Sequence, residues 1–240
     1  MQRSFSIVGN NETKENMMQK FDTPAPVTAV LDIPVGRIQF IAADRADTAV
    51  EVLPANASKS RDVKAAEQTE VVYVDGVLRI KAPEAKNQIL GPSGSIDVTV
   101  QLPAGSRVEA KASLAELRGV GRLGDVSFEG AQGTVKLDET ASARLTLQSG
   151  DVSVGRLGGP AQISTQKGDL RIAEAVRGTV TLRTEAGEIS VGAARGVSTS
   201  LDAGTSYGRI HNALKNTEGD DATLTIHATT AYGDISARSL

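Results

Sequence analysis

The C-terminal half of the chain repeats a short pattern in which a glycine is followed by alternating polar and aliphatic positions. Six segments carry the pattern, and they begin at Gly133, Gly150, Gly168, Gly187, Gly208 and Gly233. The second position after each glycine is aliphatic, and the position after that is polar or charged. Alternation with a period of two is typical of a strand with one buried and one solvated face.

A second apolar strand precedes most of these glycines, so each repeat is a strand, a glycine turn, a strand and a loop. An up-and-down sandwich would also give short strands at even spacing. It would not require the same residue type at matched positions, whereas a solenoid does, because its coils stack at about 4.8 Å and like residues form ladders. The sequence therefore favours an all-β fold, a β-solenoid of about 18-residue Gly-aliphatic repeats.

The repeat glycines are 17, 18, 19, 21 and 25 residues apart. The increase predicts insertions in the last coils, such as residues 213–221. The recurring glycine predicts a turn with positive φ in every coil, which glycine adopts without steric cost.

The N-terminal half contains short strands separated by turns, including a hairpin whose turn is Asp75-Gly76. Because solenoids need covered ends, we expect this half to cap the first coil. The chain is thus predicted to comprise a disordered tail at residues 1–20, a β-rich cap at 21–110 and the solenoid repeats at 111–240.

Charge and composition exclude several classes of function. The formal net charge is −3, which gives no electrostatic footprint for nucleic acid. Aromatic residues are 3% of the chain, with no Trp, so shelves for bases or sugars are hard to build. With no cysteine, disulfides and thiolate chemistry are excluded. No segment resembles a signal peptide or a transmembrane helix, so we expect a cytoplasmic location.

Acidic residues follow four of the repeat glycines, at Asp151, Asp169, Glu188 and Asp234. Stacked coils would align them along one edge, which suggests either a calcium ladder or catalytic carboxylates. A calcium β-roll needs Gly-Gly-x-Gly repeats, which are missing, and polysaccharide-cleaving β-helices need long loops and aromatics. We therefore interpret these carboxylates as turn residues that cap backbone donors.

The remaining candidate side chains are two histidines and two tyrosines. His211 and His227 have neither metal-ligand spacing nor a nucleophile motif beside them. Tyr207 and Tyr232 each precede a repeat glycine, so successive coils would stack their rings. Such a pair could bind a ligand, but we favour a structural stack that closes the last coils. No catalytic, cofactor-binding or metal site is predicted.

The order of the motifs resembles a family of bacterial proteins called "putative adhesins", which share a domain of unknown function built from repeated β-strands. The segments that carry the resemblance are Phe21-Asp22-Thr23-Pro24, Leu31-Asp32-Ile33-Pro34-Val35-Gly36, Ala43-Asp44-Arg45, residues 98–106 (VTVQLPAGS) and the Gly-Asp-aliphatic repeats. The resemblance extends over nearly the whole chain after the predicted N-terminal tail. The resemblance implies an all-β solenoid with no established activity.

The predicted function is therefore that of a non-catalytic interaction or scaffold protein. The alternatives are an envelope-associated stress or regulatory scaffold and a polysaccharide-binding β-helix. The final strand, Asp234 to Arg238, has no later segment to cover it, and the inward positions Asn212 and Ala237 are less apolar than in earlier repeats. We expect this C-terminal edge to bind a second copy or a partner strand by β-augmentation.

Overall fold

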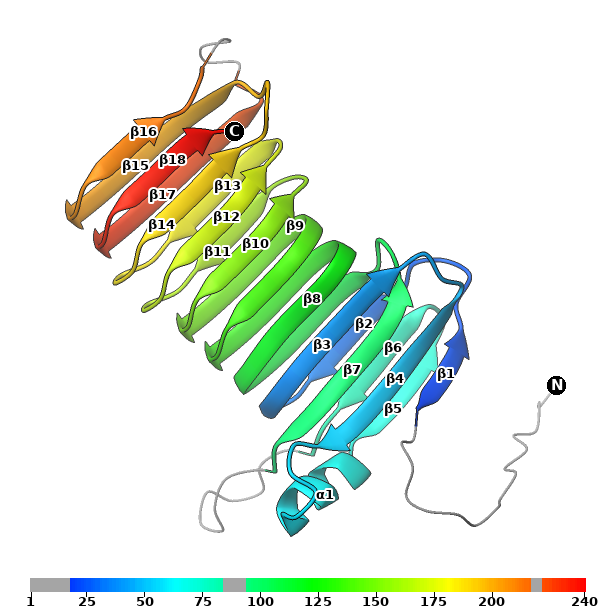
Figure 1. Ribbon diagram of the computed structural model, residues 1–240. Helices are drawn as coiled ribbons and strands as arrows, with labels where there is room; N and C mark the ends of the chain where they lie inside the picture. The colour runs from blue at the N-terminus through cyan, green and yellow to red at the C-terminus, as the bar shows by residue number, and fades with distance from the viewer. Residues whose placement is uncertain (1–17, 84–93, 217–221) are drawn as a thin grey trace, which may run out of the picture.

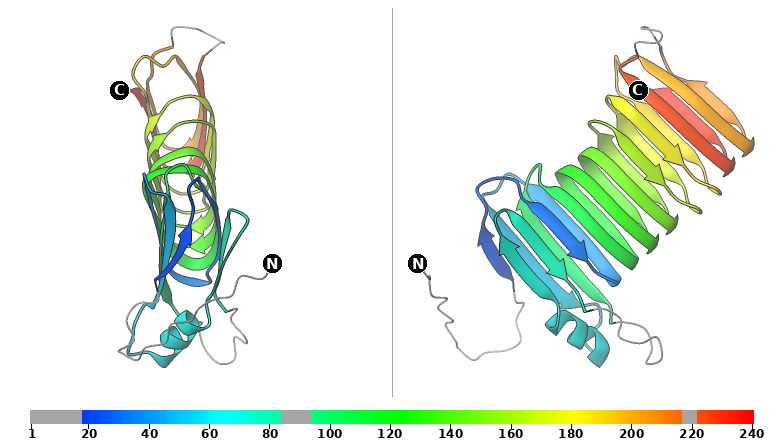
Figure 2. Two further views of the ribbon diagram at one scale, coloured as in Figure 1. Left: turned by 90° about the vertical axis from the view of Figure 1, so that its right-hand side faces the viewer. Right: turned by 180° about the vertical axis from the view of Figure 1, so that it is seen from behind.

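The alternating positions of the repeats place strands on two faces that pack against each other through their aliphatic side chains. The computed structural model describes residues 18–83, 94–216 and 222–240. These residues form one long, two-faced β-solenoid (Figure 1). Figure 2 shows the two faces edge-on and the narrow interior between them.

The strands on each face follow one another along the solenoid axis. The first face contains, in spatial order, β1 (Gln19–Asp22), β4 (Asp47–Pro54), β7 (Ile96–Pro103), β3 (Val35–Ala43), part of β8 (Arg107–Gln132), part of β9 (Val135–Ser149), β10 (Val152–Leu157), β12 (Leu170–Ala175), β14 (Ile189–Ala193), β18 (Ile235–Ser239) and β16 (Ile210–Ala213). The second face contains β5 (Glu70–Val74), β6 (Val77–Lys81), β2 (Thr28–Asp32), the remaining parts of β8 and β9, β11 (Ala161–Ser164), β13 (Gly178–Arg183), β17 (Leu224–Tyr232) and β15 (Thr199–Tyr207). The short helix α1 (Ser60–Glu67) contacts β4 and β7.

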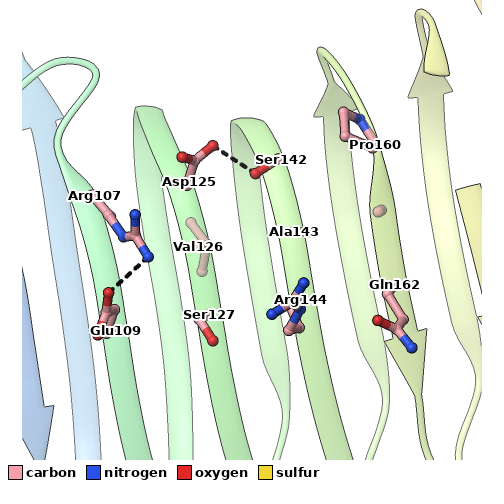
Figure 3. Close-up of a pocket in the computed structure, with 11 residues that line it drawn as sticks. Arg107, Glu109, Asp125, Val126, Ser127, Ser142, Ala143, Arg144, Pro160 and Gln162 are labelled. Atoms are coloured by element: carbon pink, nitrogen blue, oxygen red, sulfur yellow. Dashed lines mark hydrogen bonds and ion pairs between the residues drawn. The ribbon is translucent and has the colours of Figure 1, made fainter. Parts of the chain in front are cut away.

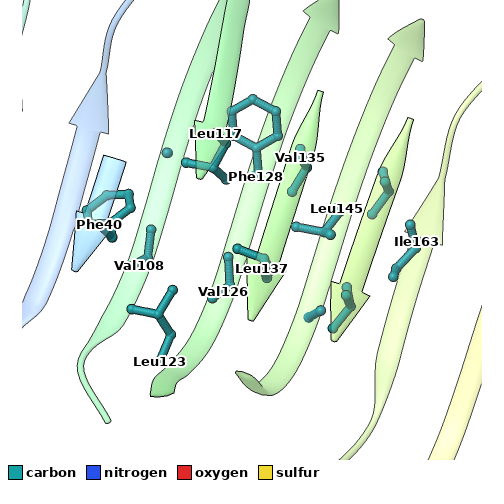
Figure 4. Packing of buried hydrophobic residues seen from close by; sticks show 14 of the residues in the cluster. Phe40, Val108, Leu117, Leu123, Val126, Phe128, Val135, Leu137, Leu145 and Ile163 are labelled. Atoms are coloured by element: carbon teal, nitrogen blue, oxygen red, sulfur yellow. The ribbon is translucent and has the colours of Figure 1, made fainter. Parts of the chain in front are cut away.

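Parallel pairing of successive coils aligns like residues into buried ladders. One ladder joins Val135, Val152, Leu170, Ile189 and Ile235, each 1% exposed. Facing ladders from the other side, such as Leu145 and Ile163, complete the interior (Figure 4). Full burial of one such side chain stabilises the fold by about 1.5–3 kcal/mol, so the ladders are the main source of stability. The predicted β-solenoid of Gly-aliphatic repeats is confirmed.

The repeat glycines lie where successive coils approach most closely. A Cβ atom on Gly168 would be 2.1 Å from the carbonyl oxygen of Gly150, and one on Gly208 would be 1.9 Å from that of Gly233. The predicted positive φ is confirmed at five of the six repeat glycines, with values of 146° at Gly133, 144° at Gly150, 143° at Gly168, 159° at Gly187 and 150° at Gly233. Glycine is therefore required for close approach as well as for the turn.

The order of the last two coils corrects the prediction that Asp234 to Arg238 forms the exposed edge. β18 lies between β14 and β16, and β17 lies between β13 and β15. After β14 the chain skips one position, forms the outermost coil with β15 and β16, and then returns to fill the gap. Ala237 is accordingly 1% exposed, whereas Asn212 does lie on the exposed terminal strand.

The N-terminal strands continue the same ladders. The predicted Asp75-Gly76 hairpin is confirmed, since β5 and β6 pair antiparallel across it. β2 and β3 pair in parallel with β8, so strand pairing crosses residue 110 without a break. The division into a cap and a solenoid stays a prediction. Residues 1–17 of the predicted tail, and residues 217–221 of the predicted insertion, lie outside the described residues.

Candidate interaction surface at the C-terminal end

β15 and β16 form the terminal coil of the solenoid, and each pairs with a neighbour on one side only. β15 pairs with β17, and β16 pairs with β18. No strand among residues 18–83, 94–216 and 222–240 pairs with their outer edges. Apart from the Thr199 N–H, which donates to the Lys215 carbonyl at 3.1 Å, this leaves backbone N–H and C=O groups of both strands available for pairing.

Apolar side chains are exposed at this end, in contrast to the interior coils. Ile210 is 46% exposed, although its ladder neighbour Ile235 is 1% exposed. Tyr207 and Tyr232 are 68% and 60% exposed. Their rings stack with centroids 5.0 Å apart and an interplanar angle of 3°, which confirms the predicted stacking. On β15, β16 and β17, Ile210 and the two tyrosines are therefore the exposed large apolar side chains, whereas Leu201 and Leu214 are partly buried against the core.

The acidic residues after the glycines cap backbone donors of the next coil. The Asp151 carboxylate accepts a hydrogen bond of 2.9 Å from the N–H of Asp169, and Asp169 accepts one of 2.8 Å from the N–H of Glu188. Asp234 accepts one of 2.9 Å from the N–H of Arg209. The predicted turn role is confirmed for these three residues. Among the described residues, no group of three or more His, Asp or Glu side chains is placed to hold a metal ion.

At the terminal coil, the position held by an acidic residue in the preceding coils is occupied by Arg209. Besides its backbone N–H, its Nη2 lies 3.0 Å from the second carboxylate oxygen of Asp234. The backbone hydrogen bond from Arg209, followed by the guanidinium, holds the pKa of Asp234 below its ordinary value. Arg209 occupies the position at which Asp151 and Asp169 present acceptors, so the terminal coil presents a cation there instead.

A ladder of threonines lies beside the repeat glycines. It was not predicted from the sequence. The four hydroxyls donate to glycine carbonyls of the neighbouring coil, in the pairs Thr165 to Gly150 at 3.5 Å, Thr184 to Gly168 at 3.0 Å, Thr230 to Gly187 at 3.1 Å and Thr205 to Gly233 at 3.0 Å. The signal is present as Thr-x-x-Gly in four successive repeats. No hydroxyl of the described residues donates to the carbonyl of Gly208 in the terminal coil.

The two histidines lie on opposite faces of the solenoid and do not form one site. His227 on β17 has its Nδ1 3.3 Å from a carboxylate oxygen of Asp202 on β15. His211 is an exposed residue of β16. The pair of His227 and Asp202 links the terminal coil to the coil beneath it.

A surface groove of about 540 Å³ lies on the second face, across β8, β9 and β11 (Figure 3). Four of its polar side chains are paired with one another. Arg107 and Glu109 form an ion pair at 2.9 Å, and the Ser142 hydroxyl donates to Asp125 at 2.6 Å. Groups that are already paired offer little to a ligand, so the terminal coil is the better candidate surface.

The fold and its open end define a β-solenoid repeat protein. Residues 2–239 match the family model described as Toastrack DUF4097, and the chain belongs to that family. No helix in the part of the chain that the structure describes is long and apolar enough to cross a membrane.

Solved structures that match over most of this chain share little sequence with it. One is a "putative cell adhesion protein" from Clostridium sporogenes, with 14% identity, coverage of 94% of this chain and 100% of the other, and a TM-score of 0.40. A "putative adhesin" from Bacteroides fragilis has 11% identity, coverage of 95% and 100%, and a TM-score of 0.46. A "putative lipid binding protein" from Parabacteroides distasonis has 11% identity, coverage of 93% and 97%, and a TM-score of 0.44. No curated protein matches the chain.

Proposed function

We propose that this protein is a non-catalytic interaction module that binds protein through its terminal coil, in the cytoplasm. The observation that carries the proposal is the unpaired outer edge of β15 and β16, together with the exposed side chains of Ile210 and Tyr207. Exposed strand edges bind partners by adding a strand, with backbone hydrogen bonds for affinity and side-chain contacts for specificity.

A non-catalytic role is supported by the way the polar side chains are used. Asp151, Asp169 and Asp234 bond to backbone N–H groups of the next coil, and Asp125 bonds to Ser142. A general acid or base has to exchange protons with a substrate, and these carboxylates are instead held by structural hydrogen bonds.

Site-specific photo-crosslinking in cells tests the proposal. A benzoylphenylalanine replaces Tyr207 at the terminal coil, and the matched control places it at Gln162, an exposed residue of β11 in the middle of the solenoid. We expect crosslinked species of higher mass from position 207 and none from position 162. Absence of crosslinks at 207, or the same products from both positions, would contradict the proposal.

The same cells, fractionated, test the location. Recovery in the soluble cytoplasmic fraction supports the proposal, whereas recovery with the envelope would favour the alternative of an envelope-associated scaffold. Binding of the purified chain to a glycan array, lost in Tyr207→Ala, would favour the alternative of polysaccharide binding.

A further inference from the structure

We infer that the occupant of the terminal coil is a second copy of this chain, bound end to end about a two-fold axis. This inference rests on the proposed function, because it identifies the partner of the same surface. It predicts that the two terminal coils pair antiparallel, β15 with the second copy's β15 and β16 with the second copy's β16.

The terminal strand β15 has little of what normally protects a sheet edge, since its one charged residue is Asp202. It is nine residues long, from Thr199 to Tyr207, and contains no Lys, Arg or Pro. Natural edges are kept short, charged, bulged or covered, because a long neutral edge pairs with other chains. At the opposite end of the solenoid, the edge strand β1 has four residues and includes Lys20. Among the described strands, the two ends therefore differ, and β15 offers the longer edge for pairing.

The presence of apolar side chains on both terminal strands favours a second copy, rather than a single added strand, as the occupant of this end. Both Leu201 on β15 and Ile210 on β16 occupy ladder positions, next to the buried residues Ile226 and Ile235. A single partner strand would pair with one face and leave the other face and the interior exposed. A second solenoid end pairs with both faces at once and covers the apolar side chains between them. At the N-terminal end, Phe21 and Tyr73 contact each other with ring centroids 5.3 Å apart and pack on the core.

Arg209 selects against the alternative of head-to-tail stacking. Asp151, Asp169 and Asp234 each accept a hydrogen bond from a backbone N–H of the next coil. A coil stacked in parallel on the terminal coil would find no such acceptor, because Arg209 holds this position and its guanidinium bonds back to Asp234. The series of carboxylate caps therefore ends at Arg209, which favours the antiparallel, closed arrangement over continuation of the parallel ladder.

The two-fold axis also fixes the register of the pairing. The nine-residue strand overlaps its own copy most completely in an antiparallel pair when its central residue, Ala203, lies opposite the second copy's Ala203. Asp202 then lies opposite Gly204 of the second copy, so the one charged residue of β15 avoids its own copy. This charge arrangement is compatible with self-association, since like charges directly opposite each other destabilise paired strands.

Charges of either sign can be introduced at Gly204 to test the pairing without changing the fold. A Cβ at this position would have no heavy atom within 4 Å, so larger side chains fit. Gly204→Glu would face Asp202 of the second copy twice per dimer, and Gly204→Lys would form two opposite-charge pairs. From the usual size of cross-strand charge effects, we expect the dissociation constant to rise about three- to tenfold in the Glu variant and to fall by a similar factor in the Lys variant.

Sedimentation velocity over a concentration series measures these constants for the intact chain and both variants, with thermal melts as a check on folding. We expect the intact chain to reach a species of twice its 25.0 kDa mass. A chain that stays monomeric at every concentration would overturn the inference, and so would Glu and Lys variants that weaken association equally.

A cysteine crosslink tests the register independently, because the chain has no cysteine of its own. Residues directly opposite in an antiparallel pair have Cα atoms about 4.5–5.5 Å apart, which a disulfide can bridge. Ala203→Cys should therefore oxidise to a disulfide-linked dimer, while Thr205→Cys, opposite Leu201, should not. Equal crosslinking of both variants, or none by Ala203→Cys, would overturn the register. Failure here, with crosslinks to a different protein retained at position 207, would overturn self-association alone and leave the proposed function standing.

Discussion

Replacing Gly168 by alanine should destabilise the solenoid strongly, although the change adds only one methyl group. The new Cβ would lie 2.1 Å from the Gly150 carbonyl oxygen, whereas ordinary contacts begin at 3.4 Å. The coils would have to separate locally by roughly 1 Å, which weakens hydrogen bonds between them such as the one of 2.8 Å from the Gly150 N–H to the Lys167 carbonyl. Alanine is also strained at a φ of 143°.

These effects can be given magnitudes. The backbone strain costs about 1–3 kcal/mol, and each weakened backbone hydrogen bond costs about 1 kcal/mol. We therefore expect Gly168→Ala to lower the free energy of unfolding by about 3–5 kcal/mol. At about 2–4 °C per kcal/mol for a chain of this size, the melting temperature should fall by about 10 °C.

The assay is urea unfolding followed by far-UV circular dichroism, combined with hydrogen exchange to localise the loss. The matched control is Gly204→Ala, where the added Cβ meets no atom within 4 Å. Its free energy of unfolding should change by no more than about 0.5 kcal/mol. Exchange should increase first in β10 and β12, which flank the substitution. Equal midpoint shifts for the two variants would refute the steric argument.

Three further predictions concern the core, metal and pH. Ile172 is 1% exposed in an aliphatic ladder, so Ile172→Asp should unfold the solenoid, whereas Ser190→Asp on the outer face should leave the thermal midpoint nearly unchanged. Calcium or a chelator should leave the melting temperature unchanged, because the Asp carboxylates already accept backbone hydrogen bonds; stabilisation that grows with calcium concentration would contradict this. The lowered pKa of Asp234 means that its charged form stabilises the fold at pH values above the ordinary 3.8, and that this contribution is lost as the pH falls through the lowered pKa. The stability difference between the intact chain and Asp234→Asn should therefore be constant between pH 7 and pH 5 and should shrink below about pH 4; a difference that grows on acidification would show the opposite sign of coupling.

The repeat and its buried face could be predicted from the sequence because they depend on local alternation. The aliphatic residue two positions after each glycine is buried from Val135 to Ile189, as a period of two requires. The stacked tyrosines and the capping role of the Asp carboxylates follow from the same alignment. Each of these features needs only that equivalent positions lie on successive coils.

The spatial order of the last coils could not be predicted in this way. The segments at Gly208 and Gly233 carry the same pattern, and nothing in a local pattern states which of two similar coils lies outside the other. The growing interval between glycines predicts insertions such as residues 213–221, whereas between Gly187 and Gly208 the extra length carries the chain past one vacant position. The threonine ladder was missed for a different reason. Thr184 precedes its glycine by three residues and was not included in the aligned segment.

The inside position of β17 and β18 has a consequence for how the chain folds as it is synthesised. From β8 to β14 the coils can add one at a time, each on the surface of the coil made before it. β15 and β16 are made next, but their pairing partners are the residues from Leu224 to Ser239. The outermost coil therefore pairs with its neighbours only after residues 224–239 have left the ribosome. Assembly coil by coil stops at Ala193 and resumes in a cooperative step that places two coils together, which makes residues 199–239 the slow part of the fold.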